Sequence, residues 1–187
     1  MELLTIFTPT YNRAHTLPRV YESLCRQTCQ DFRWLVIDDG STDNTENLIK
    51  GYISDSPFKI DYIKKENGGL YTGYNTAYAN IETELNVCID SDDFMPDDAV
   101  EIISETWEKH GSDKYAGIIG LDFLINGNPI GGYFPTTIHE CRFYDLYEQA
   151  IHFGDTKPVY RSELTSKVAP IICLLYTSPS PRDGATS

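Results

Sequence analysis

Two patterns of apolar residues alternate along the first part of the chain. Four short segments have the continuous or alternating apolar pattern of strands: residues 3–7, 34–37, 58–62 and 85–89. After each of them, apolar residues recur every three or four positions, as they do along one face of a helix. These helical positions are Leu17, Val20, Tyr21 and Leu24; Leu48, Ile49, Tyr52 and Ile53; Tyr74, Ala77, Tyr78 and Ile81; and Val100, Ile103 and Trp107. The pattern therefore predicts four units, each a strand followed by a helix.

The polar residues ahead of these patterns indicate where the helices begin. Thr16 stands in an N-cap position, with Pro18 in the first turn that follows. Asp43 and Glu46, three residues apart, have the spacing of a capping box. Pro96-Asp97-Asp98 is expected to open the fourth helix, because acidic side chains suit the positive end of the helix dipole.

Four repeated strand–helix units favour the α/β class, with parallel strands and helices on both faces of the sheet. Right-handed crossovers then place the carboxyl ends of these strands at one edge, where such sheets bind ligands. After residue 114 the pattern changes. We expect a strand at 115–125, a turn at 126–129 that leads into a hairpin with 132–134, and a short helix at 143–151.

A polar cluster follows each of the four predicted strands. The clusters are Pro9-Thr10-Tyr11-Asn12-Arg13, Asp38-Asp39-Gly40-Ser41, Asn67-Gly68-Gly69 and Asp90-Ser91-Asp92-Asp93. Because the carboxyl ends of parallel strands share an edge, we expect the clusters to converge. Each cluster alone also fits an ordinary turn or strand-to-helix connection, so their convergence is what indicates a ligand site.

The cluster of Asp90, Asp92 and Asp93 carries the clearest chemistry. Adjacent ionised carboxylates repel one another, so the cluster favours a bound cation, and carboxylate oxygens select hard ions such as Mg²⁺ or Mn²⁺. The other interpretation is a solvated acidic turn ahead of the next helix. An EF-hand is excluded, because Phe94 and Met95 stand where that loop needs a ligand and a glycine.

Composition and charge narrow the class of protein. The chain has 187 residues, 41% hydrophobic and 23% charged, which suits one globular domain. Its 15 basic and 28 acidic residues give a net charge of -13, which argues against nucleic-acid partners and requires a cation or local donors for any anionic ligand. No apolar run reaches the ~20 residues of a transmembrane span. The start of the chain lacks the basic region of a signal peptide, so a cytoplasmic location is expected.

The cysteines and histidines indicate no further site. Cys25, Cys29, Cys88, Cys141 and Cys173 form no C-x-x-C pair and are expected to be scattered reduced thiols. The four histidines have no nucleophile spaced for a catalytic triad and are expected on the surface or in loops. They are His15, His110, His139 and His152.

Taken in order, five motifs closely resemble those of family 2 glycosyltransferases of the GT-A fold. They are Pro9-Thr10-Tyr11-Asn12-Arg13; Gln27-Thr28 ahead of Asp31-Phe32; Val36-Ile37-Asp38-Asp39-Gly40-Ser41-Thr42-Asp43; Glu66-Asn67-Gly68-Gly69; and Asp90-Ser91-Asp92-Asp93. The resemblance covers residues 3 to about 108, with weaker similarity at Gly154-Asp155 and Val159-Tyr160-Arg161. It implies a mixed, mostly parallel, Rossmann-like sheet. It also implies metal-assisted transfer of a sugar, with inversion, from a nucleotide diphosphate such as a UDP-sugar to a glycan or lipid-linked acceptor.

The resemblance also implies roles for single residues. Pro9 and Tyr11 would form the base and ribose pocket, and Asp39 would accept a hydrogen bond from the nucleobase, commonly uracil. Asp90 would contact the ribose or the water shell of the metal, and Asp92 would bind the Mg²⁺ or Mn²⁺ that bridges the diphosphate. Three further residues complete the expected donor-site contacts: Arg13, Asn75 and, at the acidic cluster, Asp93.

The chain departs from the family pattern in the loop after Gly68-Gly69. Many relatives have a basic residue after this pair or just before the Asn of the following helix. Here those positions hold Leu70, Tyr71 and Tyr74. A side-chain cation for the phosphates is therefore expected elsewhere, and Arg13 and Lys65 are the candidates.

An inverting transfer also needs a carboxylate that takes the proton of the acceptor hydroxyl. In the family this residue usually lies well downstream of the acidic cluster. Asp155 and Glu163 are the late acids of this chain and fit structural roles better, so we expect the general base beyond Ile172. Residues 1–113 would then be the donor-binding half of the domain, and 114–172 the start of its acceptor-binding half.

The last residues differ in kind from the rest. Residues 173–183 resemble the translation of a sequencing-library adapter, so 173–187 are expected to be non-native, the alternative being a genuine Ser/Pro-rich tail. We accordingly expect this chain to bind a donor weakly and to transfer little sugar. The competing function is a non-catalytic module that binds a nucleotide sugar or glycan. The acidic cluster favours the enzyme, because a scaffold has no need for clustered carboxylates at a ligand edge.

Overall fold

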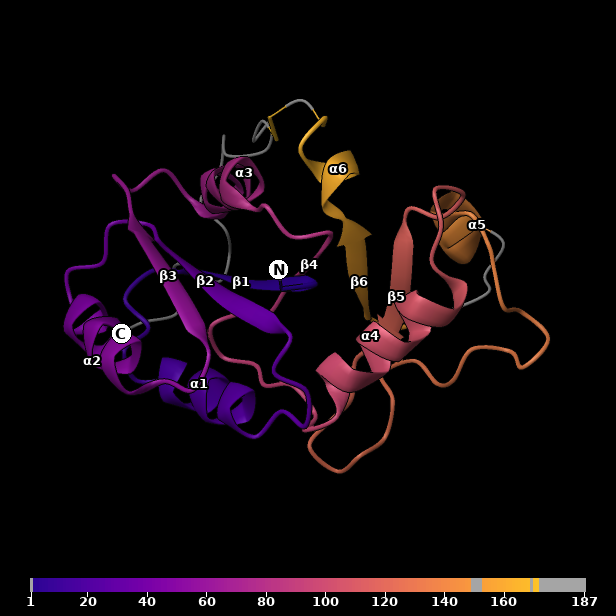
Figure 1. The fold of residues 1–187 in the computed structure, drawn as a ribbon, viewed down its shortest axis with the longest axis horizontal. Coiled ribbons are helices and arrows are strands. Elements are labelled where there is room, and N and C mark those ends of the chain that lie inside the picture. Colours follow the sequence, from indigo (N-terminus) through magenta and orange to yellow (C-terminus); the bar gives the residue numbers. More distant parts are fainter. Residues whose placement is uncertain (1, 149–152, 169, 172–187) are drawn as a thin grey trace, which may run out of the picture.

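The four predicted strand segments lie side by side in one sheet. The computed structural model describes residues 2–148, 153–168 and 170–171. Within these residues the sheet has six strands in the order β3-β2-β1-β4-β6-β5 (Figure 1). The strands are β1 (Leu4–Thr10), β2 (Phe32–Asp38), β3 (Lys59–Lys64), β4 (Leu85–Cys88), β5 (Gly117–Leu121) and β6 (Thr156–Arg161).

The first four strands are parallel, and β1 lies at their centre. Leu4 of β1 is paired with Phe32 of β2 on one side and with Leu85 of β4 on the other. β6 runs antiparallel to both β4 and β5, so the sheet is mixed and mostly parallel. This arrangement confirms the predicted α/β fold. It also gathers the carboxyl ends of β1 to β5 and the amino end of β6 at one edge, called the rim below.

Helices cover both faces of the sheet, as predicted. They are α1 (Leu17–Cys25), α2 (Thr45–Asp55), α3 (Leu70–Asn80), α4 (Ala99–His110), α5 (Phe143–Glu148) and α6 (Ser162–Thr165). Figure 1 shows α3 above the sheet and α1 and α2 below it. Each of the first four helices follows one of the parallel strands, as the apolar pattern indicates.

The side chains of β1 alternate between two cores. Ile6 packs on one face with Trp34 of β2, Val20 of α1 and Ile49 of α2. Phe7 faces the other way, in the smaller core beneath α3. Burying a large apolar side chain stabilises a fold by about 1.5–3 kcal/mol, so β1 is held firmly on both faces. The residues that follow β1 therefore start from a fixed position.

The predicted capping box of α2 is wrong. The helix begins at Thr45, whose backbone amide donates to Asp43 Oδ1 at 3.0 Å. Glu46 instead forms ion pairs with Lys50 (2.6 Å) and Lys64 (2.9 Å). Its carboxylate is drawn to two ammonium groups outside the first turn and does not reach back to close the box.

The predicted N-cap of α1 is correct in position but not in its hydrogen bond. Thr16 precedes the first helical residue, and Pro18 lies in the first turn as expected. The Thr16 hydroxyl, however, donates to the carbonyl oxygen of Arg13 at 3.2 Å and caps no helical amide. The turn before α1 is therefore closed by backbone and hydroxyl bonds to Arg13.

The segment after residue 114 differs most from the prediction. The strand expected at 115–125 is the shorter β5, and the turn that follows returns only to an isolated bridge between Phe123 and Pro129. The predicted hairpin with 132–134 is therefore wrong. Gly131 and Gly132 adopt φ angles of 81° and 94°, which turn the chain away from β5.

Other predictions fall partly outside the described residues. The short helix expected at 143–151 is present as α5 up to Glu148, and residues 149–151 lie outside the described ranges. The proposed non-native tail, 173–187, also lies outside them. Of the helices in the described ranges, none combines the length and apolar character needed to cross a bilayer.

Candidate functional site

The polar clusters predicted to converge do meet at the rim. The amide of Asp39, after β2, donates to the carbonyl of Thr10 at the end of β1 (2.8 Å). The amide of Lys65, after β3, donates to the carbonyl of Asp38 (2.9 Å). On the other side of β1, the amide of Ile89 donates to the carbonyl of Phe7 (3.0 Å). These backbone bonds fix the starting points of the loops that follow β1, β2, β3 and β4.

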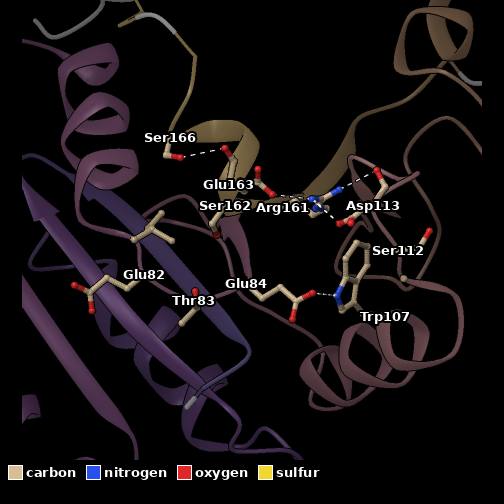
Figure 2. A pocket seen from close by; sticks show the side chains of 12 residues that line it. Glu82, Thr83, Glu84, Trp107, Ser112, Asp113, Arg161, Ser162, Glu163 and Ser166 are labelled. Carbon is tan, nitrogen blue, oxygen red and sulfur yellow. Dashed lines mark hydrogen bonds and ion pairs between the residues drawn. The ribbon is translucent and has the colours of Figure 1, made fainter.

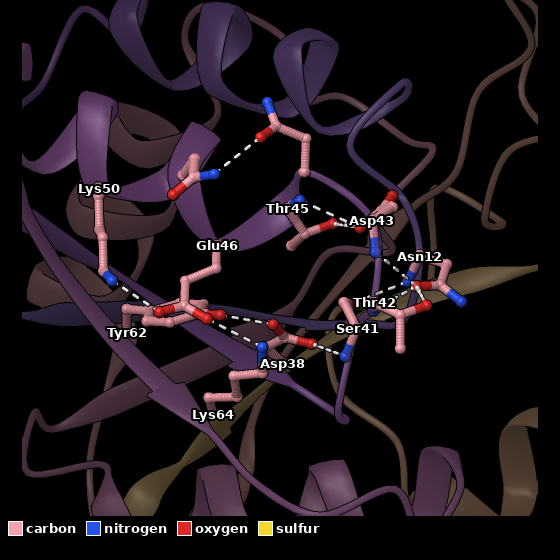
Figure 3. Close-up of polar contacts among 12 residues, drawn as sticks. Asn12, Asp38, Ser41, Thr42, Asp43, Thr45, Glu46, Lys50, Tyr62 and Lys64 are labelled. Carbon is pink, nitrogen blue, oxygen red and sulfur yellow. Dashed lines mark hydrogen bonds and ion pairs between the residues drawn. The ribbon is translucent and has the colours of Figure 1, made fainter.

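The loops after β1 and β2 are locked together by Asn12 (Figure 3). Its side-chain Oδ1 accepts hydrogen bonds from the backbone amides of Thr42 (2.8 Å) and Asp43 (3.3 Å). The backbone amide of Asn12 donates to Ser41 Oγ (2.9 Å). Asn12 has a φ of 53°, a left-handed conformation that asparagine tolerates better than most residues. One side chain thus joins two loops that the sequence places thirty residues apart.

Asp38 and Asp39 are neighbours with different surroundings. Asp38 is fully buried, where it accepts hydrogen bonds from the Ser41 amide (2.7 Å) and the Tyr62 hydroxyl (Figure 3). Burial, followed by the contact with Asp38, raises the pKa of Tyr62, so the phenol stays a donor. Asp38 therefore supports the rim from beneath and does not face a ligand.

Asp39 organises the loop after β3. Its Oδ1 accepts from the amide of Gly68 (3.0 Å), its Oδ2 accepts from the amide of Gly69 (2.8 Å), and the ammonium of Lys65 pairs with the carboxylate. Only 5% of the residue is exposed. The side-chain amide of Asn67 also donates to the Asp39 carbonyl (2.9 Å). Lys65, one candidate for a phosphate-binding cation, is therefore committed to Asp39.

The remaining predicted donor-site residues occupy different depths. Pro9 is buried, and Gly73 of α3 lies against it: a Cβ on Gly73 would meet Pro9 Cβ at 3.2 Å. Tyr11 is 48% exposed at the rim, and Arg13 is exposed beside it in the same loop. Asn75 uses both atoms of its amide on the backbone of Ile171, at 3.0 and 2.8 Å. Asn75 therefore holds a distant segment against α3 in this structure.

The acidic cluster follows β4 as a tight turn at the rim. The amide of Asp93 donates to the carbonyl of Asp90 at 3.1 Å, and the side chains of Asp90, Asp92 and Asp93 are exposed, while Ser91 is buried. Partial burial raises the pKa of Asp93, and the charges of Asp90 and Asp92 add to this, against the opposing effect of Lys157. The cluster thus carries the mutual repulsion that the sequence predicts.

These carboxylates fit a metal ion that is shared with a ligand. No group of three or more His, Cys, Asp or Glu side chains within the described ranges converges to hold a metal by itself. Mg²⁺ in nucleotide sites is characteristically bound by one or two carboxylates, with phosphate oxygens and water completing the shell. Asp90 and Asp92 supply two exposed carboxylates of this kind at the rim.

Two charged residues at the rim were missed by the sequence analysis. Asp122 follows β5, and Lys157 lies near the start of β6, across from Gly120 of β5. The Lys157 ammonium lies 3.9 Å from Asp93 Oδ2 and 3.7 Å from Asp122 Oδ2. Their convergence depends on β6 pairing antiparallel between β4 and β5, which no local pattern reveals.

A separate hollow lies at the opposite edge of the sheet (Figure 2). It has a volume of about 480 Å³ and lies between the segment before β4, the end of α4 and the start of α6. Several of its polar groups pair with each other: Trp107 donates to Glu84 (2.7 Å), and Arg161 pairs with Asp113 (3.0 Å) and Glu163 (2.9 Å). Glu163 thus forms ion pairs at this edge, away from the rim.

The geometry agrees with the comparison to protein families. Residues 5–161 match the family model described as glycosyl transferase family 2. The chain belongs to this family. The match runs from Thr5, within β1, to Arg161 at the end of β6, and so includes each rim loop described above.

Curated relatives with different products share this region. The chain is 33% identical over 107 residues to a chondroitin synthase of Escherichia coli, covering 57% of this chain and 16% of that protein. It is 34% identical over 100 residues to a hyaluronan synthase of Pasteurella multocida, covering 54% of this chain and 10% of that protein. It is 31% identical over 126 residues to the poly(ribitol-phosphate) beta-N-acetylglucosaminyltransferase TarP of Staphylococcus aureus, covering 65% of this chain and 38% of that protein. The chain therefore spans well under half the length of these relatives.

Solved structures show the same fold. The S. aureus TarS 1-349 structure in complex with UDP-GlcNAc matches with a TM-score of 0.65 at 21% identity, covering 87% of this chain and 46% of that one. The mannosyltransferase PcManGT of Pyrobaculum calidifontis, in complex with GDP-Man and Mn²⁺, matches with a TM-score of 0.61 at 18% identity, covering 86% and 45%. These likenesses establish the GT-A architecture of the chain.

Proposed function

We propose that this chain forms the donor site of a glycosyltransferase that takes a sugar from a nucleotide diphosphate. The donor that we propose is a UDP-sugar. The observation that carries the proposal is the pair of exposed carboxylates of Asp90 and Asp92 at the rim. They follow β4, next to the loops of β1 and β2, in a chain of family 2. A nucleotide lying along the rim would place its base over the β1 and β2 loops and its diphosphate near β4.

The nucleoside end of the donor is assigned to the loops after β1 and β2. Tyr11, half exposed above the buried Pro9, offers an aromatic surface for a base or ribose. Asp39 is the proposed acceptor for the base. Its Oδ2 accepts the Gly69 amide and, as a carboxylate oxygen, has capacity for a second donor. Arg13 and Asn75 are assigned to the periphery of this nucleoside site, where Asn75 would contact a donor only after releasing Ile171.

The diphosphate end is assigned to Asp92 and Asp90, which would hold Mg²⁺ or Mn²⁺. A metal ion bound there would stabilise the negative charge that develops on the departing diphosphate. The two aspartates would position that charge next to the amino end of β6. This arrangement also explains how a chain with a net charge of -13 attracts an anionic donor.

The relatives support the donor class more than the acceptor. The names of those relatives refer to chondroitin, hyaluronan and poly(ribitol-phosphate), so enzymes named for different polymers share this region. We propose a hydroxyl of a glycan or lipid-linked acceptor and inversion at the sugar carbon. The general base beyond Ile172, the low activity of this chain and its cytoplasmic location stay predictions.

Titration calorimetry with UDP, with and without Mn²⁺, tests the proposal. We compare the unchanged chain with Asp92→Asn and with Asp97→Asn, an exposed acid of the same β4–α4 segment that pairs with Arg26. Both variants remove one negative charge, so they match in net charge. We expect Mn²⁺ to raise UDP affinity about tenfold or more in the unchanged chain and in Asp97→Asn, and to have little effect in Asp92→Asn.

Two results would contradict the proposal. One is the absence of UDP binding by the folded chain at any Mn²⁺ or Mg²⁺ concentration. The other is an undiminished effect of Mn²⁺ in Asp92→Asn, because the metal would then bind elsewhere. Metal-dependent UDP binding without transfer by a longer chain that includes the acceptor-binding half would instead favour a non-catalytic nucleotide-sugar module.

A further inference from the structure

Lys157 lies at the rim on β6, the antiparallel strand between the parallel strands β4 and β5. β6 runs antiparallel between β4 and β5, with Val159 paired to Val87 of β4 and Lys157 paired to Gly120 of β5. Following the same register two residues further along β4 brings Lys157 level with Ile89, directly before the acidic turn. The side chain of Lys157 is 24% exposed, so its stem is largely covered by the sheet.

The Lys157 ammonium lies between carboxylates that belong to different loops. It is 3.9 Å from Asp93 after β4 and 3.7 Å from Asp122 after β5. Both distances exceed that of a tight N–H···O hydrogen bond, so the contacts are electrostatic and leave the ammonium free to shift by a small distance. Lys157 therefore acts as a counter-ion shared by two carboxylates.

The surrounding charges make this cation important. Asp90, Asp92 and Asp93 share the exposed turn after β4, and Lys157 lies between Asp93 of this turn and Asp122 after β5. Lys65 is engaged with Asp39 at the far side of β1. A diphosphate approaching Asp92 would meet several negative charges, and Lys157 is a basic side chain already set among them.

We propose that Lys157 is a donor-binding residue, which offsets part of the negative charge of Asp93 and Asp122 in the free protein and faces the diphosphate of a bound donor. This inference rests on the proposed function and adds to it the cation that the loop after Gly68-Gly69 lacks. The ammonium offers three N–H donors on a flexible stem, which suits a phosphate that changes charge and position as the sugar leaves.

The proposal predicts two effects of opposite sign. Lys157 repels a free metal ion at Asp90 and Asp92, because both are cations and Lys157 contacts Asp93 of the same acidic turn. Lys157 attracts the diphosphate, which is an anion. Loss of the ammonium should therefore strengthen binding of Mn²⁺ alone and weaken binding of UDP. A residue that merely holds the sheet together would weaken both or neither.

The test uses Lys157→Gln and Lys157→Arg, with Lys167→Gln as a matched control. Lys167 has a side chain that is 65% exposed and pairs with Glu163 at the opposite edge of the sheet, away from the rim. Lys167→Gln changes the net charge by the same amount as Lys157→Gln. In Lys157→Gln we expect UDP affinity, measured with Mn²⁺ present, to fall roughly three- to tenfold, and Mn²⁺ affinity, measured by electron paramagnetic resonance without nucleotide, to rise about twofold or more. Lys157→Arg should stay close to the unchanged chain, and Lys167→Gln should leave both affinities within about twofold.

A converse variant guards against a folding defect. Asp122→Asn removes one competitor for Lys157 and should raise UDP affinity, which a damaged fold would not do. The proposal is overturned if Lys157→Gln matches Lys167→Gln in both titrations, or if both affinities change in the same direction. If the unchanged chain binds no UDP, the proposed function fails, and the Mn²⁺ titration still decides whether the Lys157 ammonium weakens metal binding at the acidic turn.

Discussion

The carboxylate of Asp39 accepts a hydrogen bond from the backbone amide of Gly69 at 2.8 Å, across thirty residues of sequence. The same carboxylate accepts the amide of Gly68 and pairs with Lys65. Gly69 has a φ of 87°, a conformation that glycine adopts without strain. A single buried acid after β2 thus shapes the loop after β3, and a donor that contacts Asp39 would meet a loop that is already organised.

Asp39→Asn should destabilise the fold and loosen this loop. The amide keeps one acceptor oxygen but loses the charge that pairs with Lys65, and its NH₂ group faces backbone donors. We expect a loss of about 1–3 kcal/mol in the free energy of unfolding, measured by urea denaturation. The surface variant Asp97→Asn should change it by less than about 1 kcal/mol. Equal effects of the two variants would show that Asp39 does not organise the loop.

Asn12 provides a test that separates conformation from hydrogen bonding. Asn12→Ala loses the acceptor for Thr42 and Asp43 and places an alanine at a φ of 53°, whereas Asn12→Gly loses only the acceptor. We expect Asn12→Ala to cost about 2–3 kcal/mol in unfolding free energy and Asn12→Gly about 1 kcal/mol less. If the two variants are equally stable, the left-handed conformation carries no strain.

Two helical glycines offer a matched pair. Gly73 of α3 lies against Pro9, whereas a Cβ on Gly51 of α2 would meet nothing within 4 Å. Gly51→Ala should therefore stabilise the protein by about 0.5–1 kcal/mol, the usual gain in helix propensity. Gly73→Ala should lose that gain and destabilise, because the rigid Pro9 ring cannot move aside. Thermal unfolding measures both, and equal stabilisation would contradict the close approach of α3 to β1.

Stability in acid should depend on Glu46. Hydrogen bonds from Lys50 and then Lys64 lower its pKa from the usual 4.5 to about 2. A carboxyl with a lowered pKa in the folded state stabilises the fold above its unfolded pKa, and this contribution is lost as the pH falls from about 4.5 to about 2. Glu46→Gln should flatten the fall in the urea midpoint over this range.

High salt provides the control for that measurement. Glu46 is exposed, so about 1 M NaCl should screen its ion pairs and bring the acid profile of the unchanged chain toward that of Glu46→Gln. If the two profiles already coincide at low salt, Glu46 does not contribute to the acid dependence of stability.

The apolar pattern was sufficient to predict the parallel part of the fold. Strand segments such as 34–37 are buried on both faces of the sheet and are therefore apolar throughout. The helix that follows each strand buries one apolar face, so the local sequence indicates both the strand and the helix. The antiparallel part was harder to predict. β6 reads Lys157-Pro158-Val159-Tyr160 without strict alternation, and its place between β4 and β5 follows from tertiary pairing alone.

The same distinction applies to the site. The loops after β1, β2 and β4 converge because the strands are parallel, so Asp39, Asp90 and Asp92 could be singled out from sequence. The bonds of Asp39 to Gly68 and Gly69 could not, since they depend on how two loops fold against each other. Asn75 was assigned to the donor site by resemblance, and its contact with Ile171 could not be read from sequence. Lys157 and Asp122 could not be predicted as site residues, because their place at the rim depends on the antiparallel pairing of β6 with β4 and β5.

The most direct test of the donor site is the anomalous signal of manganese in crystals soaked with UDP and Mn²⁺. We predict one strong peak within coordinating distance of an Asp92 carboxylate oxygen, with the diphosphate beside it and the base over the loops after β1 and β2. A manganese peak distant from both Asp90 and Asp92, with UDP ordered elsewhere on the protein, would contradict it.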